Sequence, residues 1–166
     1  MNCARREADP PSGDAGRQAC LDLLSAVLAH PPGGVHGTAL FLLDCCGPRL
    51  DPEAVAEVER RLRAVLPAWH RLLHGEAGEF VVIAQGLVDG GAVLTAAARL
   101  VHAFDDALQT SDLPLGPEVA IGIAFALQHG GRAEAMLKAA EASLRESRIA
   151  ARLGRRGTLP PPERFE

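Results

Sequence analysis

Apolar side chains recur every three or four residues in four stretches of the chain, a spacing that predicts amphipathic helices. Three of them cover residues 15–29, 89–110 and 132–153, and the fourth starts at Pro52 and stops at Pro67. Asp14 and Asp51 stand where N-caps are expected. The predicted core faces are Cys20, Leu23, Leu24, Val27 and Leu28; Val55, Val58, Leu62 and Val65; Val93, Leu94, Ala97, Leu100, Val101, Phe104 and Leu108; and Met136, Leu137, Ala140 and Leu144.

Short apolar runs between these helices predict strands. Residues 38–43 form a run that ends in Asp44, as expected of a buried central strand. Residues 69–73 and 79–84 predict a hairpin closed by a glycine-containing turn. Residues 119–127 predict a last strand, in which Gly122 marks a close approach of another segment. The order of elements predicts an α+β fold, palm-like or ferredoxin-like, with a mixed or antiparallel sheet flanked by helices.

A chain of 166 residues has room for one ordinary domain. We expect that domain to occupy residues 14–153, after a disordered lead-in over 1–13 and before a flexible tail over 154–166, both rich in charge and proline. The helix over residues 15–29 either packs on the domain or mediates dimer formation, and the pattern alone leaves both open.

Composition excludes several classes of function. The formal net charge of −4 argues against a general nucleic-acid binder. No apolar stretch approaches the length of a membrane span or a signal peptide, and the four cysteines lack the spacing of zinc or redox sites. A cytoplasmic protein with reduced cysteines is therefore expected. Its richness in Ala, Arg, Gly and Leu, with no Tyr, suggests a bacterial source.

Three segments together resemble the GGDEF domain of bacterial diguanylate cyclases, over residues 36–153. Residues 41–44 (Phe-Leu-Leu-Asp) look like the family's strand that ends in a metal-binding acid. Residues 76–80 (Glu-Ala-Gly-Glu-Phe) look like an eroded copy of the signature itself. Residues 119–124 (Val-Ala-Ile-Gly-Ile-Ala), with the helix that follows, are similar to the family's penultimate strand and last helix.

The resemblance implies a metal site that is incomplete in this chain. Asp44 matches the first ligand, and the backbone carbonyl of Cys45 the second, whereas Gly78 stands at the third signature position in place of an acid. Glu79 retains the fourth position. The family's segments for guanine recognition are shortened away, and residues 67–70 lack its product-inhibition motif. Glu76, two residues before Gly78, is a doubtful substitute ligand.

Two arginines four residues apart on the last predicted helix, Arg148 and Arg152, resemble the family's positions that contact the triphosphate. Each candidate also has a purely structural interpretation. Asp44 could cap a turn near Gly47, Glu79 could lie on a solvated face of the hairpin, and the arginines could belong to an ordinary charged helix surface.

The missing acid favours a catalytically inactive GGDEF-like module that binds a partner protein or a second copy of itself. The resemblance implies a cyclic di-GMP-linked pathway, such as control of exopolysaccharide synthesis, cellulose included, or of motility. One alternative is a sensor that binds GTP or cyclic di-GMP without turnover. A less favoured one is a diverged cyclase that uses Mg²⁺; otherwise no cofactor is expected. No sequence motif supports a hydrolase or a phosphate-loop nucleotidase.

Overall fold

The computed structural model describes residues 14–30, 37–46, 50–67, 70–74, 78–109, 118–129 and 131–155. The elements are α1 (Asp14–Ala29), β1 (Gly37–Cys46), α2 (Pro52–Val65), β2 (Arg71–His74), β3 (Glu79–Leu87), α3 (Gly90–Gln109), β4 (Glu118–Phe125), α4 (Ala126–His129) and α5 (Ala133–Arg155). The predicted order is confirmed, with the short α4 added. The predicted lead-in and residues 156–166 of the predicted tail lie outside the described residues, while α5 continues to Arg155.

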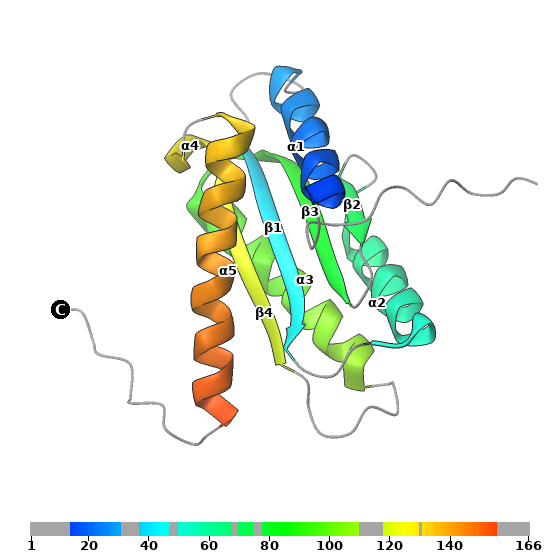
Figure 1. The fold of residues 1–166 in the computed structure, drawn as a ribbon. Coiled ribbons are helices and arrows are strands. Elements are labelled where there is room, and N and C mark those ends of the chain that lie inside the picture. Colours follow the sequence, from blue (N-terminus) through cyan, green and yellow to red (C-terminus); the bar gives the residue numbers. More distant parts are fainter. Residues whose placement is uncertain are drawn as a thin grey trace, which may run out of the picture.

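The sheet has four strands in the order β2-β3-β1-β4, and every pairing is antiparallel. Helices α1 and α5 cover one face, and α2 and α3 cover the other. Figure 1 shows α1 and α5 in front of the sheet and α3 behind it. The predicted α+β class with flanking helices is confirmed, and β1 lies at the centre of the sheet as its apolar run predicted.

Side-chain alternation along β1 divides the core into two layers. Phe41 and Leu43 contact the layer of α2 and α3, whereas Leu40 and Leu42 contact the layer of α1 and α5. All four are at most 2% exposed. The same alternation turns the next even-numbered residue, Asp44, toward α5.

Helix α5 lies unusually close to β4, because Gly122 has no side chain. A Cβ added at Gly122 would lie 2.2 Å from the carbonyl oxygen of Ala140 and 2.7 Å from Cβ of Leu144. The predicted core residues Met136, Leu137, Ala140 and Leu144 are all buried. The close approach predicted from the glycine is therefore confirmed, and α5 is the segment that makes it.

Helix α5 also covers the open edge of β4. The Oγ atoms of Ser147 and Ser143 accept hydrogen bonds from the backbone N–H groups of Ile121 and Ile123, at 3.0 and 3.1 Å. An edge strand otherwise presents such donors to other chains. The two hydroxyls, one helical turn apart, thus satisfy two donors of an edge that pairs with no further strand among the described residues.

Helix α1 packs on the domain. Cys20 and Leu24 are fully buried in the same layer as α5, and Arg17 Nε lies 3.2 Å from Glu141 Oε1 of α5. Of the two roles left open by the sequence, packing is the one observed. None of the described helices combines the length and the hydropathy needed to cross a membrane.

Some sequence predictions were wrong in detail. Val65 and Leu94, expected in the core, are 42% and 65% exposed. They sit at the edges of helical faces whose centres, such as Leu62 and Ala97, are buried. The last strand ends at Phe125 rather than at residue 127, because the chain turns into α4, where His129 Nδ1 lies 3.0 Å from the Phe125 nitrogen.

Candidate functional site

Two acidic side chains meet at one end of the sheet. Asp44 of β1 and Glu79 of β3 are direct partners in the antiparallel ladder, so their side chains lie side by side on the face covered by α5. Their side chains are only 16% and 24% exposed. Glu79 therefore does not lie on a solvated face of the hairpin, and Asp44 lies within β1 rather than in a turn after it.

Arg148 of α5 reaches both acids. Its Nε donates a hydrogen bond of 2.8 Å to Asp44 Oδ2, and its Nη2 lies 3.7 Å from Glu79 Oε1. The packing of α5 on Gly122 explains the contact: Leu144 lies over Gly122, and Arg148 follows one helical turn later, where Asp44 pairs with Ala120. One guanidinium thus supplies a positive charge to two partly buried carboxylates that would otherwise repel each other.

Glu79 is incompletely satisfied. Among the described residues, its Oε2 is buried and has no hydrogen-bond partner. A buried carboxylate oxygen without a donor is costly. Glu79 thus depends for compensation on the positive charge of Arg148.

Gly78 departs from an acidic ligand in conformation as well as in chemistry. Its φ of +91° lies in the region that favours glycine. A Cβ at this position would also lie 2.7 Å from Cδ1 of Leu50. Both the backbone and the neighbour therefore disfavour any side chain at this position.

Cys45, whose carbonyl the resemblance implied as a ligand, turns its side chain to the opposite face of the sheet. It is 6% exposed and belongs to the layer of α2 and α3. The side chains of Cys46 and Arg152, and the whole of Glu76, lie outside the described residues. Of the predicted site residues, the structure therefore brings together Asp44, Glu79 and Arg148.

These residues do not fit the divalent metal that the resemblance implies for a cyclase. Mg²⁺ requires several hard oxygen ligands in near-octahedral geometry. Here Asp44 is bound to a guanidinium, and Gly78 supplies no side-chain oxygen. Among the described residues, no group of three or more His, Cys, Asp or Glu side chains could hold a metal ion.

A cavity of about 420 Å³ opens beside the ion pair. Its polar wall combines Glu79 and Arg148 with Glu141 and Arg145 of α5, and its apolar wall includes Leu42. The side chain of Arg145 is exposed although it lines the cavity. Acidic and basic groups alternate here, so the cavity does not carry the purely positive lining that favours a triphosphate.

No family model matches the sequence, and no curated protein matches it significantly. Solved structures do match. A sensory box/GGDEF family protein from Caulobacter crescentus is 20% identical, with a TM-score of 0.64 over 81% of this chain and 92% of that one. The GGDEF domain of PA1120 (YfiN or TpbB) from Pseudomonas aeruginosa is 16% identical, with a TM-score of 0.59 over 81% of this chain and 87% of that one.

This chain has the fold of a GGDEF domain. The predicted resemblance is thereby confirmed at the level of the fold. A third match, the diguanylate cyclase SiaD from Pseudomonas aeruginosa, was solved in complex with its activator SiaC; it is 15% identical, with a TM-score of 0.55 over 81% of this chain and 55% of that one. The sequence reasoning missed the pairing of Asp44 with Arg148, which are 104 positions apart.

Proposed function

We propose that this chain is a GGDEF-fold module without cyclase activity that acts through contacts with a partner protein, or with a second copy, in a bacterial cyclic di-GMP-linked system. Control of exopolysaccharide synthesis, cellulose included, or of motility would suit such a module. The observation that carries the proposal is the ion pair of Arg148 with Asp44, 2.8 Å long, beside Glu79.

The chemical argument concerns what a guanidinium can replace. Joining two nucleoside triphosphates requires divalent cations that neutralise phosphate charge and activate the attacking hydroxyl. Arg148 offers the acids one positive charge and fixed N–H donors, and it has no free coordination position for a phosphate oxygen or a hydroxyl. It therefore stabilises Asp44 and Glu79 as parts of the fold and leaves them unsuited to chemistry.

Contact with a protein is supported by a structural neighbour. SiaD, which shares the fold, was solved bound to a protein that activates it. A domain of this shape can thus present a surface to a regulatory protein. For this chain, such a role explains why an extensive core is kept around a site that lacks a metal-binding acid.

A second candidate is a sensor that binds GTP or cyclic di-GMP without turnover. The cavity of about 420 Å³ with Arg145 and Arg148 on its wall favours it. Glu79 and Glu141 on the same wall oppose it, because carboxylates repel phosphate groups. A rise in melting temperature with GTP, GDP or cyclic di-GMP, lost when both Arg145 and Arg148 are changed to Ala, would support this candidate.

The test of the first proposal is a product assay. The purified chain is incubated with GTP and either Mg²⁺ or Mn²⁺, and cyclic di-GMP is quantified by chromatography. We expect no product from the wild type and none from Arg148→Ala, because Gly78 remains without an acid. The diguanylate cyclase SiaD together with its activator SiaC, assayed in parallel, serves as the positive control. A cooperative thermal melt shows that the chain is folded.

Steady formation of cyclic di-GMP by the folded wild-type chain would overturn the proposal and favour the diverged cyclase. Product from Arg148→Ala alone would show that the arginine is a reversible block on an otherwise competent site. That outcome also contradicts the proposal, because it would mean that cyclase activity is possible without an acid at the position of Gly78.

A further inference from the structure

A second cavity lies on the opposite face of the sheet and toward its opposite end. Its volume is about 330 Å³, and it lies between the end of α2, strand β3 and helix α3. Ala84 and Leu87 line it near the end of β3, whereas Glu79 begins that strand. The cavity is therefore separate from the site of Asp44 and Arg148.

The inner wall of this cavity is apolar and well ordered by packing. Phe41, Val82 and Leu100 line it and are at most 2% exposed. On α3 the facing positions carry the small residues Ala92 and Ala96, and none of the described side chains fills the space beside them. Water gains few hydrogen bonds in such a space, so an apolar group that displaces it is stabilised.

The mouth of the cavity carries an available positive charge. Arg99 of α3 is exposed, and among the described residues no carboxylate pairs with it. It also lines a shallower depression of about 460 Å³ between α2 and α3, which shares Val65 with the cavity. His70, also on the wall, has its pKa lowered by burial and is therefore neutral near pH 7.

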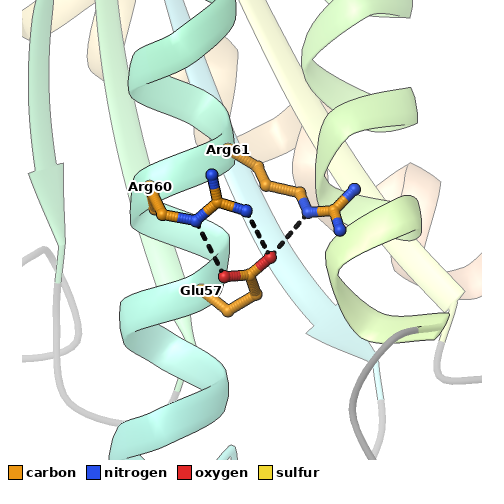
Figure 2. A network of polar contacts seen from close by, with 3 residues as sticks. All are labelled: Glu57, Arg60 and Arg61. Carbon is orange, nitrogen blue, oxygen red and sulfur yellow. Dashed lines mark hydrogen bonds and ion pairs between the residues drawn. The ribbon is translucent and has the colours of Figure 1, made fainter.

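The neighbouring cations of α2 are already engaged. Arg60 donates to both oxygens of Glu57, at 2.9 and 2.8 Å, and Arg61 Nε donates to Glu57 Oε1 at 2.7 Å. Figure 2 shows Arg60 facing both oxygens of this carboxylate, whereas Arg61 meets it through Nε and points its terminal nitrogens away from it. Glu57 compensates one of their two positive charges and holds both side chains, whereas Arg99 has no carboxylate partner among the described residues.

We propose that this cavity binds a small amphiphilic anion, a medium-chain carboxylate, with its chain against Leu66, Leu87 and Ala96 of the lining and its carboxylate on Arg99. The volume sets the size of the ligand. At about 30 Å³ for each water-sized group, the space of about 330 Å³ holds roughly eleven, which is close to the size of decanoate with its carboxylate at the mouth. Ligand pockets of this kind combine apolar walls with a few placed polar groups. The proposal goes beyond the proposed function and does not depend on it.

Calorimetric titration of the purified chain with decanoate, well below its micellar concentration, tests the site. We expect saturable binding at one site per chain, and weaker binding of decanol by about tenfold, because decanol lacks the charge that Arg99 compensates. Arg99→Gln should weaken decanoate by a similar factor and leave decanol unchanged. Ala96→Phe, which fills the cavity, should reduce the affinity for both at least tenfold.

Arg132→Gln is the matched control, since Arg132 is an exposed arginine at the start of α5. It should bind decanoate as the wild type does, and thermal melts of all variants verify folding. Absence of saturable binding to the wild type, or binding that neither Arg99→Gln nor Ala96→Phe weakens, would overturn the proposal. Self-association that Ala96→Phe abolishes would assign the cavity to a second copy of the chain and would overturn it as well.

Discussion

Charged side chains are arranged differently on the two faces of the sheet. On the face of α1 and α5, the acids Asp44 and Glu79 are partly buried and share one cation, Arg148. On the face of α2 and α3, the core beneath the cavity is apolar, and Arg99 stands exposed at its mouth. The first arrangement satisfies its charges internally, and the second leaves a charge available next to an unfilled apolar space.

This difference indicates where a ligand would gain most. An anion or cation entering the site of Asp44 must compete with an existing ion pair, which is held in place by the packing of α5. An amphiphile entering the second cavity displaces water from apolar walls and meets Arg99, which has no carboxylate partner in the part of the chain that the structure describes. The family resemblance identifies Asp44, Glu79 and Arg148. The proposed ligand site at Arg99 therefore lies in a different part of the molecule.

The largest expected effect comes from separating α5 from the sheet. Gly122→Ala places a Cβ 2.2 Å from the backbone oxygen of Ala140, which cannot move without shifting the helix. We expect a loss of about 3 kcal/mol in the free energy of unfolding, measured by urea denaturation.

Gly131→Ala is the matched control for this substitution. Nothing lies within 4 Å of a Cβ added at Gly131, which precedes α5. Its effect should stay within about 0.5 kcal/mol. Equal effects of the two substitutions would contradict the view that α5 is held against the sheet at Gly122.

A smaller loss is expected when the shared cation is removed. Arg148→Met keeps most of the apolar stem but leaves Asp44 and Glu79 adjacent without compensation. Because the arginine side chain is 33% exposed, solvent screens part of the effect, and we expect a loss of about 1–2 kcal/mol. Arg145→Met, an exposed arginine of the same helix, should change stability by less than about 0.5 kcal/mol.

A double-mutant cycle with Asp44→Asn isolates the pair itself. The cost of Arg148→Met should be smaller in the Asp44→Asn background, because one of the two carboxylates is already neutral. Additive effects in the cycle would mean that the contact of 2.8 Å contributes no net stability.

The hydrophobic pattern predicted the helices and strands well, but it did not predict the ion pair of Asp44 with Arg148. The spacing of Met136, Leu137, Ala140 and Leu144 identified the buried face of α5, and Gly122 identified its close approach. These signals are local, since each element must bury its own apolar face. The partner of Asp44 depends instead on the register in which α5 packs on β4, and no local pattern encodes that register.

The errors at Val65 and Leu94 have a related origin. Helical periodicity identifies a face but not its width, and the flanking residues of a face can lie beyond the sheet. The second cavity was also missed, because its small residues Ala92 and Ala96 read as ordinary helix formers. A cavity is a property of what neighbouring elements leave unfilled, so it emerges only from their packing.

The smallest expected effect concerns the charges of α2 and tests whether Arg99 is distinct from its neighbours. Hydrogen bonds from Arg60, which has the larger effect, and from Arg61 lower the pKa of Glu57 from 4.5 to about 2. A carboxyl whose pKa is lower in the folded state contributes stability above its unfolded value, and that contribution is lost as the pH falls from about 4.5 toward 2. The decline of the urea midpoint between pH 5 and pH 3 should therefore be steeper for the wild type than for Glu57→Gln.

Glu146→Gln, at an exposed position of α5 without an ion pair among the described residues, should decline as the wild type does. The same Glu57→Gln variant bears on the anion site, because it releases Arg60 and Arg61 beside the depression that Arg99 lines. If Glu57 compensates these arginines, decanoate should bind the variant at least as tightly as the wild type at pH 7. Weaker binding would show that the network of α2 positions Arg99, and the cation at the mouth would then be part of a larger arrangement rather than a single available charge.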